Sequence, residues 1–272
     1  MRVSKRTNNY QESVIRDMTR LAIEHEAINL SQGFPDFDPP QEVIQAASAA
    51  ITGGYNQYSP ARGILDLRVK LAEQYSDKLG WNLDAERHVT VTCGVTEAIN
   101  VAMLALLDPG DEIIIIEPAH ENFVPSALLS GAHPVAVPLT ERNFRLDVDL
   151  LKQSLTDRTR ALMLNTPHNP SGRVFDVDEM STITDFVVNN DLVLITDEIY
   201  DRILYDGRKH VCPGSMEALR ERTVTLGGMS KTFAITGWRL GYIIASSELM
   251  AAMTPIHDYL TICAPTPLQM AA

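Results

Sequence analysis

From Val89 onward the chain repeats one pattern: a short run of apolar and β-branched residues, a turn, and then often a segment with helical spacing. Strands are predicted at residues 89–93, 112–117, 135–137, 160–164, 192–196, 223–226 and 240–244. The clearest intervening helices are predicted at 96–107 and 177–189. Strands that alternate with helices predict an α/β fold, a three-layer sandwich with a mostly parallel central sheet.

The first 50 residues lack this alternation. They contain a predicted helix at 12–26 and a turn-rich stretch at 31–40 with three prolines and a glycine. We therefore expect residues 1–48 to form an N-terminal arm and part of a small domain. Residues 49–272 are expected to form one large domain.

Composition excludes several classes of function. The formal net charge is -12 and no long Lys/Arg run interrupts it, so nucleic acid and anionic membranes are poor partners. No apolar stretch reaches the roughly 18 residues of a membrane span. Cys93, Cys212 and Cys263 are far apart and odd in number, which favours reduced thiols in the cytoplasm. The sequence has no closely spaced Cys or His pair, so it does not predict a metal site.

Chemically informative residues follow four of the predicted strands. Gly94 follows the first, the loop Asn165–Gly172 another, Asp197 a third and Lys231 a fourth. Ligands of parallel sheets bind beyond the carboxyl ends of the strands. We therefore expect these four segments to meet at one edge of the sheet.

Lys231 lies in the apolar, Gly-rich run Gly227–Gly241. Such surroundings remove water from a lysine, lower its pKa and make its neutral amine a nucleophile. Arg239 follows eight residues later; it is either an ordinary ion-pair residue or a phosphate ligand. An amine nucleophile beside an arginine suggests a carbonyl cofactor that carries a phosphate.

The other three segments each have a structural and a functional interpretation. Asp197 either caps a helix or pairs with a ring nitrogen and holds its proton. The loop with Asn169 is either a tight turn or a rigid support for an amide that donates to the cofactor's phenolate oxygen. The turn at Gly94 either simply joins strand and helix or offers free N–H groups to a phosphate.

Competing nucleotide and hydrolase motifs are absent. A P-loop requires glycine directly before the lysine and another six residues before it, where this chain has Ser230 and Thr225. The dinucleotide fingerprint and the nucleophile elbow of hydrolases are also missing.

Taken in order, these motifs resemble the pyridoxal-phosphate enzymes of fold type I, specifically the class I/II aminotransferases. The segments that carry the resemblance span nearly the whole chain: Gln32–Asp36, Asn56–Tyr58, Gly94–Thr96, Asn165–Gly172, Asp197–Tyr200 and Ser230–Arg239. The stretch from Gln32 to Pro40 and the segment Asn56–Tyr58 look most like the kynurenine, glutamine and methionine transaminase branch. The resemblance implies ping-pong transamination between an L-amino acid and a 2-oxo acid, in the large cofactor-binding domain at 49–272.

The resemblance also implies catalytic roles. Lys231 forms the aldimine with pyridoxal 5'-phosphate and later moves the proton. Asp197 pairs with the pyridine nitrogen, and Asn169 and Tyr200 bind the phenolate oxygen. The backbone near Gly33, together with Asn169, is expected to contact the substrate.

The phosphate site is implied in the same way. Arg239, Ser230 and the turn at Gly94, with the N–H groups of Val95 and Thr96, are expected to bind the phosphate. The family often has a hydroxyl at the position of Gly228, which this chain lacks.

Two further roles follow from the resemblance. His120 stands where the family usually has an aromatic residue stacked on the cofactor ring. Tyr58 is expected to reach the phosphate of the neighbouring subunit, which implies a homodimer with shared active sites.

Two alternatives to an active transaminase remain open. A carbon–sulfur β-lyase would use the same Lys231 and Asp197, so the motifs cannot separate the two reactions. Family members continue beyond the position of Ala272 and there supply an arginine for the substrate's α-carboxylate. The chain, which stops inside an apparent helix after Met253, therefore resembles a C-terminally truncated form, and an inactive cofactor-binding fragment is the second alternative.

Overall fold

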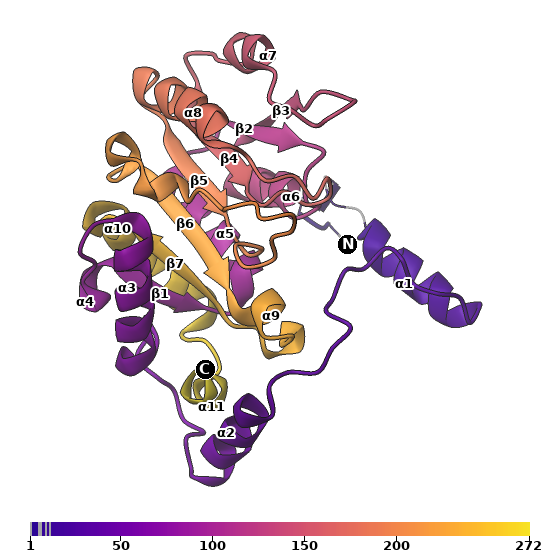
Figure 1. Ribbon diagram of the computed structural model, residues 1–272, viewed down its shortest axis with the longest axis vertical. Helices are drawn as coiled ribbons and strands as arrows, with labels where there is room; N and C mark the ends of the chain where they lie inside the picture. The colour runs from indigo at the N-terminus through magenta and orange to yellow at the C-terminus, as the bar shows by residue number, and fades with distance from the viewer. Residues whose placement is uncertain (1, 5–6, 9, 11) are drawn as a thin grey trace.

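The computed structural model describes residues 2–4, 7–8, 10 and 12–272, so five residues of the expected N-terminal arm (1, 5, 6, 9 and 11) lie outside it. Figure 1 shows the arrangement of its helices and strands. The helices are α1 (Val14–Glu24), α2 (Gln41–Thr52), α3 (Leu65–Leu79), α4 (Ala85–His88), α5 (Gly94–Leu106), α6 (Phe123–Ser130), α7 (Val148–Gln153), α8 (Val177–Asn189), α9 (Met229–Thr232), α10 (Ser247–Thr261) and α11 (Thr266–Ala271). The strands are β1 (Val89–Thr92), β2 (Glu112–Glu117), β3 (His133–Pro138), β4 (Thr159–Asn165), β5 (Val193–Asp197), β6 (Thr223–Gly228) and β7 (Gly241–Ala245).

All seven predicted strands are present in one sheet of order β1-β7-β6-β5-β4-β2-β3. The pairs among β3, β2, β4, β5 and β6 are parallel, and β7 is antiparallel to both β6 and β1. Because β7 reverses direction between them, β1 and β6 run the same way. The carboxyl ends of β1, β4, β5 and β6 therefore meet at one edge, as predicted, and the mostly parallel α/β fold is confirmed.

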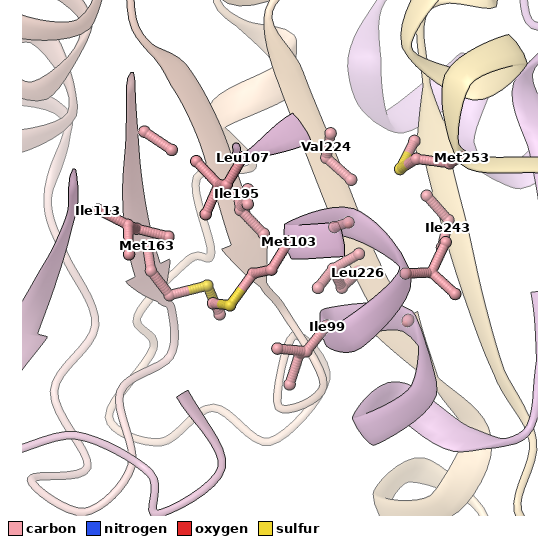
Figure 2. Close-up of a cluster of buried hydrophobic side chains, with 14 of the residues drawn as sticks. Ile99, Met103, Leu107, Ile113, Met163, Ile195, Val224, Leu226, Ile243 and Met253 are labelled. Atoms are coloured by element: carbon pink, nitrogen blue, oxygen red, sulfur yellow. The ribbon is translucent and has the colours of Figure 1, made fainter. Parts of the chain in front are cut away.

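Helices cover both faces of the sheet. On one face α5, α6 and α10 pack against alternate strand residues, and Figure 2 shows Ile99 and Met103 of α5 among Ile195, Val224 and Leu226 of the sheet. On the other face α8 covers the central strands and α3 covers β1 and β7. The isoleucines of β2 alternate between the two cores, which explains their continuous run.

The N-terminal region differs from the sandwich. Helix α1 projects from the body in Figure 1 and has no buried residue, although its apolar residues lie along one stripe. Helix α2 packs on α11, which connects the start of the chain to its end. The domain boundary expected after residue 48 lies inside α2.

Other details differ from expectation. Helices α2 and α3 were not predicted. No strand is predicted before Val89, so the alternation of strands and helices that identified the later helices is missing there. The helix expected to run from Met253 to the last residue is wrong: α10 ends at Thr261, and α11 follows a turn around Pro265. No helix of the described residues is long and apolar enough to cross a membrane.

Candidate functional site

A cavity of about 640 Å³ opens at the carboxyl ends of the central strands. Ten of the twelve residues predicted for the site line it: Gly33, Val95, Thr96, His120, Asn169, Asp197, Tyr200, Ser230, Lys231 and Arg239. They come from the N-terminal segment, from α5, and from the loops after β2, β4, β5 and β6. The fold thus brings together segments that are far apart in sequence.

Lys231 lies on the one-turn helix α9, directly after β6. Its Nζ donates to the carbonyl oxygen of Gly33 at 2.7 Å, which joins the N-terminal segment to the cavity. Burial lowers the pKa of Lys231, Asp197 acts in the opposite direction, and Arg239 lowers it further. A larger share of neutral amine is therefore present than on a surface lysine.

Asp197 is the last residue of β5 and is buried. Burial raises the pKa of its carboxyl to about 7, opposed by the N–H of Ile199, which donates to Oδ1 at 3.1 Å. A turn rather than a helix follows Asp197, so the helix-capping interpretation is wrong. Among the residues that the structure describes, no cation lies in hydrogen-bond contact with this buried carboxylate, which requires a positive partner to stay ionised.

The loop after β4 is fixed by an interaction that the sequence analysis missed. The side chain of Asn165 accepts from the N–H of Asn169 at 2.6 Å and donates to the carbonyl oxygen of Asp197 at 2.8 Å. The Asn169 amide then reaches the Tyr200 hydroxyl at 3.3 Å, so the two predicted phenolate ligands are neighbours. Burial raises the pKa of Tyr200 to about 12, which keeps it a hydrogen-bond donor.

An anion cradle forms where α5 begins. The first N–H groups of a helix have no acceptor within the helix, and Val95 and Thr96, in the first turn of α5, line the cavity. Gly94 has a φ of 78°, and a Cβ there would collide with the guanidinium of Arg239. A Cβ on Gly241 would lie 2.7 Å from the nitrogen of Val95. Close backbone packing therefore places Arg239 beside the helix N-terminus.

The remaining predicted residues have distinct positions. Ser230 is buried at the cavity wall. His120 lines the cavity and packs against Phe123, and burial lowers the pKa of its imidazole. Tyr58 is 78% exposed and does not line the cavity of its own chain.

The residues present fit the cofactor implied by the resemblance. The cradle of N–H groups and Arg239 suits a phosphate, because both provide positive charge and donors. The raised pKa of the Asp197 carboxyl suits a protonated ring nitrogen, which would supply its missing positive partner. The partly desolvated amine of Lys231 suits an aldehyde.

Comparison with known proteins agrees with this chemistry. A family model described as "Aminotransferase class I and II" matches residues 25–272. The chain is 36% identical to the methionine aminotransferase of Escherichia coli, over 95% of the chain and 67% of the relative. It is 37% identical to kynurenine–oxoglutarate transaminase 1 of Homo sapiens, over 94% of the chain and 64% of the relative.

Solved structures match equally closely. An N-succinyldiaminopimelate aminotransferase from Mycobacterium tuberculosis superposes with a TM-score of 0.96 at 40% identity, over 99% of this chain and 71% of that one. An aspartate aminotransferase from Thermus thermophilus, solved with maleate, gives a TM-score of 0.93 at 33% identity, over 100% and 72%.

Proposed function

Since this chain belongs to the class I and II aminotransferases, which depend on pyridoxal phosphate, we propose that the cavity around Lys231 is its active site. The reaction of the family is transamination between an amino acid and a 2-oxo acid. The observation that carries the assignment is the meeting of three features in one cavity: a partly desolvated amine, a buried carboxylate and a helix N-terminus with an arginine.

Lys231 is the catalytic base in this proposal. When bound, pyridoxal phosphate withdraws electrons from the substrate carbon that loses a proton. The neutral Nζ of Lys231 takes that proton and returns it, because its lowered pKa leaves a lone pair available. Asp197 holds a proton on the ring nitrogen through its buried carboxylate.

The surrounding residues orient the cofactor and the substrate. Arg239, Ser230 and the N–H groups of Val95 and Thr96, which follow the turn at Gly94, hold the phosphate. Asn169 and Tyr200, already in contact, donate to the phenolate oxygen. His120 would lie against the ring of a bound cofactor, and the Gly33 carbonyl oxygen, which now accepts from Lys231 Nζ, would be free to contact the substrate when Lys231 leaves it.

The proposal extends to assembly and location. We assign a homodimer in which Tyr58 completes the partner's phosphate site, because this exposed tyrosine does not line the cavity of its own chain. Residues 1–48 belong to an arm and small domain, and residues 49–272 to the large domain. Three free cysteines support a cytoplasmic location.

The substrate side chain is proposed to be bulky and apolar. A second cavity of about 560 Å³ adjoins the first and shares Lys231 and Tyr200 with it. Phe34 and Phe37 line this second cavity. Phe123 does not line either cavity, because its ring lies in the core beneath α6.

Product analysis tests the reaction. The chain, loaded with pyridoxal phosphate and mixed with methionine, should release the matching 2-oxo acid and convert the cofactor to its amine form. Lys231→Ala should release none. Pyruvate and ammonia from a β-substituted sulfur amino acid, without any oxo acid acceptor, would instead identify a β-lyase. A cofactor-loaded chain that converts neither substrate would contradict both enzymatic assignments.

A further inference from the structure

A buried carboxylate and imidazole meet directly behind the phosphate cradle. Glu97 of α5 and His257 of α10 are both buried, and Glu97 Oε1 lies 2.7 Å from His257 Nδ1. The opposite ring nitrogen, Nε2, lies 2.7 Å from the carbonyl oxygen of Ala61. A carbonyl oxygen only accepts, so Nε2 carries a hydrogen. A second proton must then lie between Nδ1 and Glu97, which the two residues share.

The Glu97 carboxylate also fixes the turn at Cys93, which leads into α5 and the phosphate cradle. Glu97 Oε2 accepts from the N–H of Cys93 at 2.5 Å, and Cys93 directly precedes α5. Thr261, the last residue of α10, donates to Oε1 at 2.6 Å. The thiol of Cys93 lies 3.7 Å from the carbonyl oxygen of Cys263. These contacts join the end of α10 to the turn from which Val95 and Thr96 present their N–H groups.

The charge of this carboxylate opposes phosphate binding unless it is balanced. A bare carboxylate one turn inside the N-terminus would reduce the positive potential that attracts an anion. Burial lowers the pKa of His257, but its hydrogen bond to Glu97 and the charge of Glu97 outweigh burial, so the pKa is raised. The pair is therefore neutral overall while it keeps the shared proton.

We propose that Glu97 and His257 are a positioning pair that fixes the phosphate-binding turn and holds the cofactor phosphate tightly only while their shared proton is present. The inference rests on the proposed placement of the phosphate at the start of α5. Among the described residues, the titratable groups near the pair include Asp258 on α10, which raises the pKa of His257, Cys93 in the turn and Cys263 beside it. Arg239 lies against Gly94 and lines the cavity where the phosphate is proposed to bind.

The test separates the phosphate from the rest of the cofactor. Pyridoxine 5'-phosphate has an alcohol in place of the aldehyde, so it cannot bond covalently to Lys231. The ratio of its affinity to that of unphosphorylated pyridoxine, measured by calorimetry, isolates the contribution of the phosphate. Titration of Asp197 changes the affinity for both ligands in the same way, so its effect cancels in the ratio. Above about pH 7 the phosphate itself is almost fully ionised.

In the wild-type chain this ratio should fall about tenfold as the pH is raised above about pH 7, at the pH where the pair loses its proton and becomes an anion. Glu97→Gln should remove the fall. A glutamine can accept from the N–H of Cys93 and donate to His257 Nδ1 without a shared proton, so the turn keeps its shape.

His257→Gln should lower the ratio about tenfold even at about pH 7, because the charge of Glu97 is no longer balanced. The double variant Glu97→Gln/His257→Gln should restore it. Glu112→Gln is the matched control: this buried carboxylate is paired with Arg158 at the opposite end of β2, so its loss should lower stability and leave the ratio unchanged.

Three results would overturn the inference. A wild-type ratio that falls with pH and still falls in Glu97→Gln would show that another group is responsible. A ratio that is independent of both residues but lowered by Arg239→Gln would reduce the pair to a structural role and leave the proposed function intact. A phosphate that adds no affinity in wild type, with no effect of Arg239→Gln, would contradict the proposed function as well.

Discussion

At the scale of single residues, the phosphate cradle depends on the absence of side chains. Gly94 combines a positive φ with a Cβ position that Arg239 occupies. Arg239 itself has a φ of 57°, a left-handed conformation that costs energy for any residue but glycine. Surrounding contacts therefore hold the arginine against a backbone preference, which is typical of residues placed for a ligand.

Gly94→Ala should weaken binding of pyridoxal phosphate by about tenfold or more, because the new methyl group displaces the guanidinium. It should also cost about 1 kcal/mol of stability through the left-handed backbone. Gly80→Ala is the matched control: Gly80 has a φ of 72° and open space around its Cβ position. It should show the stability cost alone, in urea unfolding, and an equal loss of cofactor affinity in both variants would contradict the role of Gly94.

Asp197 gives a pH-dependent prediction for the chain without cofactor. Its pKa is about 7 when folded and about 3.9 when unfolded, so the folded chain binds more protons between these values. Stability from this group is complete below about pH 4 and is lost as the pH rises through about 7, by about 4 kcal/mol at most.

Asp197→Asn should therefore raise the free energy of unfolding at about pH 8 and leave it nearly unchanged at about pH 4, where wild type is protonated. Urea unfolding of both chains at the two pH values measures the difference. The same variant should bind the cofactor more weakly. An equal stability change at both pH values would show that the buried charge is not the cause.

Much of the site was predictable from sequence, because its functional side chains follow the carboxyl ends of the predicted strands. Asp197 and Lys231 each follow an apolar strand, and a parallel sheet brings such positions to one edge. The support of Asn165 and the pair of Glu97 with His257 were not predictable. These contacts join residues 32 and 160 positions apart and have no local spacing pattern.

At the scale of elements, strands were easier to predict than helices. An apolar run such as Glu112–Glu117 permits few alternatives, whereas α3 carries charged residues and is recognised only by its burial against β1 and β7. The reversed direction of β7 could not be deduced, because a short strand has the same sequence pattern in either direction. The apolar stripe of α1 also contains no buried residue, so here an amphipathic pattern marks an exposed helix face and not a part of the core.

Helix α8 offers a test of local stability away from the site. Its N-cap Asp176 and Glu179 form a reciprocal capping box, with hydrogen bonds of 3.0 and 3.3 Å. Asp176→Ala should cost about 1 kcal/mol in urea unfolding and leave cofactor affinity unchanged. Asp178→Ala removes a nearby exposed acid that caps nothing and should cost less. Equal losses would contradict the capping assignment.

At the scale of the whole molecule, the proposed homodimer shares its sites between subunits. If Tyr58 serves the partner's phosphate, Tyr58→Ala and Lys231→Ala remove different parts of the same site. A hybrid dimer then contains one site with both defects and one site with neither.

Mixing the two variants after subunit exchange should restore tight cofactor binding at about one quarter of all sites, although neither variant shows it alone. The measurement is the cofactor absorption at low cofactor concentration, with sedimentation to establish the dimer. No restoration in a chain that does exchange subunits would place Tyr58 outside the partner's site.

The central claim is that Lys231, among all lysines of the chain, holds pyridoxal phosphate. Borohydride reduction of the loaded chain fixes the cofactor onto the lysine that holds it, and peptide mass mapping identifies that residue. We expect the label on Lys231 at one per chain and none on the exposed Lys70. No label on Lys231, or a label spread over surface lysines and unchanged in Lys231→Ala, would contradict the account.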